Sequence, residues 1–178
     1  GKTLGQREAL MASRMLRAGN VFMKFSHNGP PHDRWVWLSD DCTKVQWCEP
    51  GKKQKGVLKG AEAAMALTEM SDIHEGLDSA LGRHQTSSFF QSHRTFKGHH
   101  SGIHKLDRDC CLTVLGSGRS RSLDIQAPNK MVQHDWLVAL RLLRALRLEG
   151  IEDLKGRRHV RSFIKVREHR RRAEPSFD

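Results

Sequence analysis

The residues of this chain whose types could do chemistry are mainly cationic. The formal net charge is +11, and the segment from Gly156 to Arg172 carries +7 of it, because eight basic residues stand there against Glu168 alone. A second cluster lies in a short glycine-rich stretch and consists of four lysines, Lys52, Lys53, Lys55 and Lys59. Such an excess of positive charge predicts attraction to a polyanion, either nucleic acid or an acidic membrane surface.

Patterns that indicate catalysis are missing from the sequence. No glycine-rich phosphate loop precedes a helix, since Gly116-Ser117-Gly118 is typical of a hairpin turn. There is also no nucleophile elbow and no paired carboxylate motif. We therefore expect a protein that is not an enzyme and that uses no cofactor.

Cysteine and histidine spacing does not favour a metal site. The four cysteines contain no CxxC pair, so reduced thiols in a cytosolic protein are the expectation; they are Cys42, Cys48, Cys110 and Cys111. The best set of potential ligands matches no recognised zinc spacing and consists of His99, His100, His104 and Cys110. We expect no metal. Protonation of the histidines below pH 7 would add positive charge and strengthen binding to an anionic membrane.

The first half of the chain predicts a helix followed by an antiparallel meander. Apolar spacing indicates a helix over residues 3–17, which Gly19-Asn20 ends. Strand-like runs follow at residues 21–25, 34–38 and 44–47, joined by a loop over residues 26–32 and by a polar turn at residues 39–41.

The second half predicts more strands, a long insert and a closing helix. Strands are expected at residues 57–59, 67–74, 111–115 and 122–126, although residues 61–65 favour a helix. Residues 77–109 are polar and lack a sustained period, which predicts one long, mobile insert.

The strongest predicted element begins at Pro128-Asn129. Its apolar stripe is made by Val132, Trp136, Ala139, Leu140, Leu143 and Leu146. Arg141, Arg144 and Arg147 lie off that stripe, Gly150 ends the helix, and a second helix is expected over residues 152–172. No run approaches the roughly 20 apolar residues that a membrane span needs.

These features resemble the pleckstrin-homology (PH) domain family over residues 19 to about 147. The likeness rests on Gly19–Phe25 as an opening strand, His32–Ser39 as the second strand, 111–114 with 121–125 as the last two strands, and Trp136 in the closing helix. The resemblance implies a seven-stranded, bent antiparallel β-sandwich capped by a C-terminal helix. We accordingly expect an N-terminal helical extension (1–18), a PH domain (19–148, with 77–109 inserted between its fifth and sixth strands) and a basic C-terminal helical extension (149–178).

The resemblance also implies a lipid site. Lipid-binding members place a Lys at the end of the first strand and a Lys/Arg-x-Arg pair at the start of the second, and the matching residues are Lys24, His32 and Arg34. Fixed cations that converge on phosphate oxygens are what such binding needs. His32 departs from the pattern, which favours a single phosphate over a polyphosphorylated inositol. The lysine cluster would lie between the third and fourth strands and add long-range attraction. Alternatively, Lys24 and Arg34 are ordinary solvated strand ends, and the lysines form a solubilising loop.

Two other segments allow several interpretations. The basic tail carries a thin apolar strip made by Val160, Phe163, Ile164 and Val166. It is an interfacial membrane helix, a helix packed on the domain, or a flexible tail for nucleic acid or nuclear import. Phe89-Phe90 in the insert either wedges between lipid head groups or folds onto the core.

Within the family, the chain is most similar to the acylated PH-domain proteins of apicomplexan parasites, which sense phosphatidic acid. That likeness implies a cytosolic module that is peripheral on a membrane face, at secretory organelles called micronemes, where it helps to regulate exocytosis. We also expect the chain to be a monomer. Two rival functions stay open: a phosphoinositide-specific PH domain, and a protein- or nucleic-acid-binding module that uses the basic tail. Nucleic acid is the less favoured partner, because the chain has no Tyr and few aromatic residues that bases could stack on.

Overall fold

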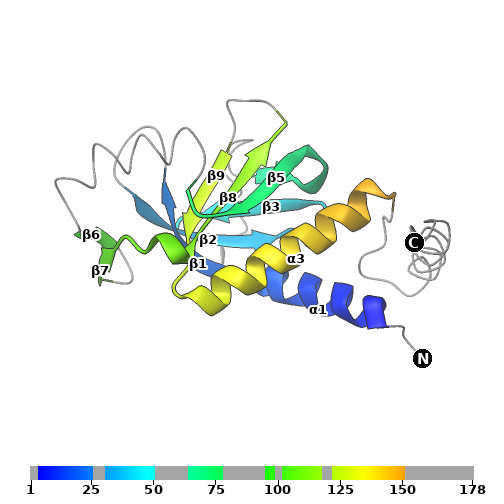
Figure 1. The fold of residues 1–178 in the computed structure, drawn as a ribbon, viewed down its shortest axis with the longest axis horizontal. Helices are drawn as coiled ribbons and strands as arrows, with labels where there is room; N and C mark the ends of the chain where they lie inside the picture. Colours follow the sequence, from blue (N-terminus) through cyan, green and yellow to red (C-terminus); the bar gives the residue numbers. More distant parts are fainter. Residues whose placement is uncertain are drawn as a thin grey trace, which may run out of the picture.

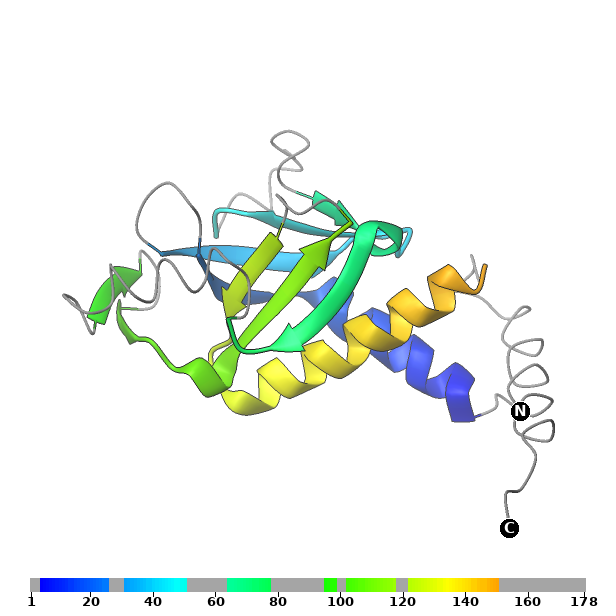
Figure 2. The ribbon, with the colours of Figure 1, turned by 45° about the horizontal axis from the view of Figure 1, so that its top comes forward.

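A computed structural model describes residues 4–25, 31–50, 64–77, 95–98, 102–117 and 122–150. Its centre is a seven-stranded antiparallel sheet with the order β4-β3-β2-β1-β9-β8-β5, so β4 and β5 are its two edges. Its strands are β1 (Asn20–Phe25), β2 (His32–Leu38), β3 (Lys44–Cys48), β4 (Ala64–Ala66), β5 (Met70–Glu75), β8 (Cys111–Gly116) and β9 (Ser122–Gln126). Figure 2 shows how the sheet bends, with β1–β4 behind and β5, β8 and β9 in front.

Two helices lie side by side on the molecule, as Figure 1 shows. The first, α1 (Leu4–Ala18), confirms the helix that the sequence predicts over residues 3–17. Gly19 then turns the chain into β1 with φ +73°, a conformation that suits glycine. A Cβ at Gly19 would lie 2.7 Å from the Val36 carbonyl oxygen on β2, so only glycine lets the two segments approach this closely.

The second helix, α3 (Lys130–Leu148), closes the fold. The side chain of Asn129 caps its first turn by accepting a hydrogen bond of 2.9 Å from the Val132 amide. Most of its predicted apolar stripe is buried, and Trp136 is only 2% exposed. The Trp136 ring meets Phe22 of β1 edge to face, with 4.7 Å between the ring centroids. The helix therefore packs on the inner face of the sheet at β1.

Both faces of β1 are buried, which the alternation in the sequence did not reveal. Phe22 belongs to the main core, together with Trp136 and the inner residues of the other strands. Phe25 lies three residues further along, on the opposite face, where it packs with Cys111. Leu77 and Leu106 pack against this second cluster, so both ends of the long insert rest on the outer face of the sheet.

Most predicted strands are confirmed, and two segments differ. Residues 61–65 favour a helix by composition, yet Ala64–Ala66 forms β4. Pairing with β3 and burial of Met65 in the core outweigh the helical preference of these alanines. The second difference concerns the insert, whose described parts contain elements that the sequence pattern did not predict: β6 (Thr95–Gly98), β7 (Gly102–Lys105) and the 3-10 helix η4 (Arg108–Cys110). Among the described strands, β6 and β7 form a separate pair of their own.

A short connection carries the chain from one edge of the sheet to the other. The 3-10 helix η3 (Leu67–Glu69) follows β4 directly and leads directly into β5. The Leu67 amide donates to the Thr43 carbonyl and the Ser117 amide donates to the Glu69 carbonyl, at 2.9 Å and 2.7 Å. These bonds tie the β2–β3 turn to the end of β8 and hold the bend of the sheet. The strand expected at residues 57–59 and the helix expected at residues 152–172 lie outside the described residues.

Candidate functional site

The three residues that the family resemblance implies for a lipid site lie at one end of β1 and β2. The strand register pairs Lys24 directly with His32, and Phe22 directly with Arg34. Residues directly opposite each other on paired strands share a face, as do residues two positions apart on one strand. Lys24, His32 and Arg34 therefore share one face.

That face is the inner one. Phe22 points to Trp136 in the core, and Val36 and Leu38 further along β2 are also core residues. On the other side of Lys24, β9 contributes Ile125, which is buried in the same core. The cations thus extend the inner face beyond its apolar part, where the sheet ends. All three side chains are half-buried.

Arg34 has the most clearly defined surroundings of the three. Its Nη1 donates a hydrogen bond of 2.9 Å to the carbonyl oxygen of Asp33. Loss of water on partial burial lowers the pKa of Arg34 from its ordinary value, and the negative charge of Glu49 is the largest effect that opposes this. An arginine remains protonated at neutral pH even so. The site therefore contains a partly desolvated guanidinium, which binds an anion more strongly than a fully solvated one does.

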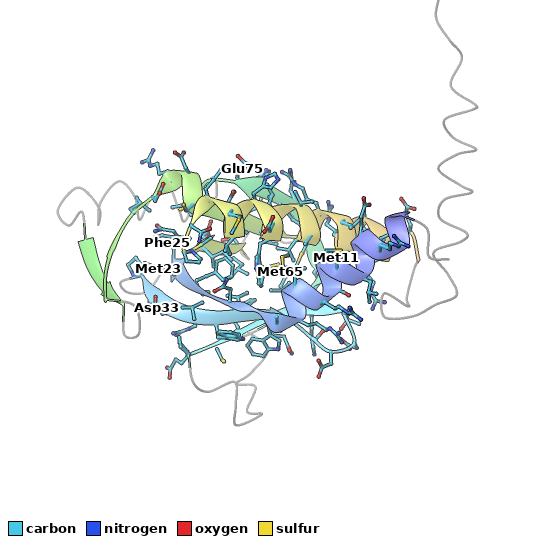
Figure 3. The ribbon with its side chains drawn as sticks, turned by 90° about the horizontal axis from the view of Figure 1, so that it is seen from below. Met11, Met23, Phe25, Asp33, Met65 and Glu75 are labelled. Atoms are coloured by element: carbon cyan, nitrogen blue, oxygen red, sulfur yellow. The ribbon has the colours of Figure 1, made fainter. Side chains whose placement is uncertain are left out.

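The outer face at the same end of the sheet is closed by buried side chains. Figure 3 labels Met23, Phe25 and Asp33 there, at the opposite end of the molecule from Met11 on α1. Met23 and Asp33 lie opposite each other across β1 and β2 and both are buried. Among the described residues, the outer face is thus closed to an anion, whereas Lys24, His32 and Arg34 lie on the inner face next to the rim of the sheet.

Several predicted site residues lie outside the described residues. They include the lysine cluster, Lys52, Lys53, Lys55 and Lys59. The aromatic pair Phe89-Phe90, the histidines His99 and His100, and the basic tail are likewise outside that part of the chain. Their proposed roles stay predictions.

The arginines of α3 have a structural use that the sequence did not suggest. Arg141 donates from Nε and Nη2 to the Ile73 carbonyl of β5, at 3.0 Å and 2.7 Å. Arg144 donates to the Met70 and Ser71 carbonyls, at 2.7 Å and 2.6 Å. The third, Arg147, donates to the Cys42 and Asp41 carbonyls in the β2–β3 turn, at 3.2 Å and 2.9 Å. These cations hold the helix against the edge strand β5 and that turn.

The thiols next to β8 are protonated at neutral pH. Burial, with a hydrogen bond of 3.3 Å to the Asp107 carboxylate, raises the pKa of Cys110 to about 11. Burial raises the pKa of Cys111 to about 12. Neither thiol has the low pKa of a nucleophile or a metal ligand. Across the described ranges, no three His, Cys, Asp or Glu side chains gather into a possible metal site, and no helix is both long and apolar enough to span a membrane. No disulfide joins the four cysteines of the described chain.

The seven antiparallel strands and the closing helix with its buried Trp136 agree with the arrangement that the family resemblance predicts, and the strands form one bent, open sheet. The chain has a PH-like fold. No protein-family model and no curated protein matches the sequence.

Solved structures of PH domains resemble the chain at low identity. The "PH domain from TgAPH" is 10% identical over 81% of this chain and 94% of that one, with a TM-score of 0.48. Inner Membrane Complex Sub-compartment Protein 1 from Toxoplasma gondii is 9% identical over 82% and 97%, with a TM-score of 0.49. The N-terminal PH domain of human ARAP2 is 15% identical over 73% and 81%, with a TM-score of 0.43. At these values the likenesses indicate no ligand or partner for this chain.

Proposed function

We propose that this chain is a membrane-recruitment or membrane-sensing module that binds an anionic phospholipid, with phosphatidic acid as the favoured lipid. The observation that supports this most is the placement of Lys24, His32 and Arg34 on one face at the end of the paired strands β1 and β2. Two fixed cations and an imidazole thereby lie together on the face that a single phosphate would meet. A fold shared by many unrelated binding proteins would not support this by itself.

The residue types at this site suit a phosphate that carries no other headgroup. The Arg34 guanidinium offers a planar fork of donors, which matches two phosphate oxygens, and Lys24 offers a compact point charge. Both contacts are strongest with an exposed, doubly ionised phosphomonoester, which phosphatidic acid presents at the membrane surface. A polyphosphorylated inositol would need more fixed cations, and His32 stands where the family pattern has a further one.

Long-range attraction supports the same proposal. The net charge of +11 draws the chain toward an acidic leaflet, and each lysine near such a surface contributes about 1 kcal/mol. The cluster Lys52, Lys53, Lys55 and Lys59 would supply this term without any defined pocket. Because surface attraction is screened by salt and a phosphate contact at half-buried cations is screened less, salt separates the two contributions.

The cellular role follows only from the family resemblance. If this chain acts as the acylated parasite proteins do, it is peripheral on the cytosolic face of micronemes and helps to regulate their exocytosis. A single acyl chain gives marginal anchoring, so a second contact with a specific lipid would make attachment durable. A tagged chain should then leave these organelles when Lys24 and Arg34 are both replaced.

Co-sedimentation with vesicles tests the proposal. The vesicles contain phosphatidic acid, phosphatidylserine or a phosphoinositide in a phosphatidylcholine background, matched for net charge, at two salt concentrations. We expect binding to phosphatidic acid to persist at the higher salt and to fall about tenfold or more in the double variant Lys24→Gln/Arg34→Gln. The matched control is Arg7→Gln/Arg14→Gln, which removes the same charge from exposed positions on α1.

The same experiment separates the rivals. Equal loss from all vesicles at the higher salt would show unspecific charge attraction and contradict the proposal. Preference for the phosphoinositide, strengthened by His32→Lys, would indicate the phosphoinositide-specific alternative. Loss of binding on removal of residues 156–178, with no effect of the double variant, would assign binding to the basic tail.

A further inference from the structure

An acidic residue lies beside the candidate phosphate site. Glu49 directly follows β3, whose register pairs Val36 with Trp47 and Trp35 with Cys48. Continuing the antiparallel register by one residue puts Glu49 opposite Arg34. Trp47 is a core residue, so Glu49, two positions on, shares the inner face with Arg34.

The electrostatics of Arg34 agree with this placement. Partial burial lowers the pKa of the guanidinium, and of the carboxylates whose negative charge raises it again, Glu49 has a larger effect than Asp33. Glu49 itself is exposed. Its carboxylate is therefore well placed to interact with Arg34 while it remains accessible from the rim.

We infer that Glu49 is a specificity-determining residue, whose carboxylate competes with an incoming phosphate for Arg34 and limits the negative charge that the site accepts. This inference rests on the proposed function. A phosphate bound to Arg34 must either displace the Glu49 carboxylate or lie beside that carboxylate. In the second case the two negative charges repel each other.

The consequence is a selective site rather than a strong one. Lys24 and Arg34 are two fixed positive charges, and the nearby carboxylate of Glu49 offsets part of the charge of Arg34. One phosphate with two negative charges is still attracted, and His32 adds a further cation when it is protonated. A headgroup with several phosphates meets repulsion from Glu49 as well as a shortage of cations. Discrimination against such headgroups would thus come from a repulsive element as much as from an attractive one.

The test compares four proteins: the full chain, Glu49→Gln, Arg34→Gln and the combined variant Arg34→Gln/Glu49→Gln. The matched control is Glu8→Gln, which makes the same change at an exposed position on α1. Binding is measured on vesicles containing phosphatidic acid and on vesicles containing a phosphoinositide. We expect Glu49→Gln to tighten binding to phosphatidic acid about three- to tenfold, because the screened repulsion between the carboxylate and the phosphate is removed. Binding to the phosphoinositide should tighten more, so the difference in affinity between the two lipids should become smaller. Glu8→Gln should change neither by more than about twofold.

Two results would overturn the inference while leaving the proposed function standing. In the first, Arg34→Gln weakens lipid binding, but Glu49→Gln changes lipid binding no more than the control Glu8→Gln does. The other is an equal gain from Glu49→Gln with and without Arg34, which would make Glu49 a general surface charge. Failure of Arg34→Gln to weaken binding to any lipid would contradict the proposed function itself.

The interaction between Arg34 and Glu49 can also be measured without lipid. The free energy of unfolding of the same four proteins gives the coupling between the two side chains directly. We expect the effects of Arg34→Gln and Glu49→Gln to be non-additive, with the double variant more stable than their sum predicts. Additive effects would show that the two side chains do not interact, and the inference would fail.

Discussion

Replacing Arg144 by glutamine tests whether the arginines of α3 are structural. Nε and Nη2 of Arg144 donate to the carbonyl oxygens of Met70 and Ser71, at 2.7 Å and 2.6 Å, on the edge strand β5. A glutamine side chain at this position would keep part of the aliphatic stem but lose the fork and the charge. The edge carbonyls of β5 would then depend on water.

The magnitude follows from the contacts. A hydrogen bond to a charged group contributes about 1.5–3 kcal/mol, and two such bonds would give more than that if they were fully buried. Arg144 is only half-buried, so water replaces part of the interaction. We therefore expect Arg144→Gln to lower the free energy of unfolding by about 1.5–3 kcal/mol in total.

Chemical denaturation followed by tryptophan fluorescence measures this loss. Arg14→Gln is the matched control, because Arg14 is exposed on α1 and should change stability by no more than about 0.5 kcal/mol. Arg144→Lys should fall between the two, since lysine keeps the charge but cannot form the fork. Equal stability of Arg144→Gln and Arg14→Gln would refute the reasoning. Folded Arg144→Gln should still bind phosphatidic acid as the unchanged chain does, which separates structural arginines from the site.

Two further changes probe the fold. Trp136→Ala should lower the free energy of unfolding by about 3–5 kcal/mol, because it removes the edge-to-face contact with Phe22 and leaves a cavity. Val138→Ala, on the exposed side of the same helix, should lower it little. Similar losses of stability in the two variants, measured by thermal unfolding, would contradict the role of Trp136. Hydrogen bonds from Ser39 and Thr43 lower the pKa of Asp41 from 3.8 to about 2, so the stabilisation from its ionised form is complete above pH 3.8 and is lost as the pH falls toward 2. Asp41→Asn should therefore flatten the pH dependence of stability between about pH 4 and pH 2, and an unchanged acid profile would show that the β2–β3 turn does not depend on this carboxylate.

Much of the fold was predictable from the sequence because its strongest signals are local. The stripe around Trp136 has helical spacing over many residues, and the cap at Asn129 marks where it begins, so α3 was expected nearly as it stands. The strands before and after the insert are short runs of β-favouring residues between turns, and most lie where they were expected. β4 was not predictable, because its alanines favour a helix and only pairing with β3 makes it a strand.

The surroundings of the candidate site depend on which residues of neighbouring strands pair with each other, and this register cannot be read from a single sequence. Lys24, His32 and Arg34 were found by their resemblance to a family pattern, but that they share the inner face with Phe22 follows from the pairing of β1 with β2. Glu49 lies just past the end of β3, and nothing in its local sequence connects it with Arg34. The sequence placed the arginines of α3 off the apolar stripe but did not predict their partners, because hydrogen bonds to carbonyls far away in the sequence leave no local pattern.

The most direct measurement is an NMR titration of the full chain with short-chain phosphatidic acid, compared with the phosphatidylserine of the same chain length. If a phosphate binds between the cations, the largest amide shifts should map to the end of β1 and the start of β2, at Lys24, His32 and Arg34, and should be much smaller with phosphatidylserine. Shifts that centre on α1 or α3, or that are the same for both lipids, would contradict the account.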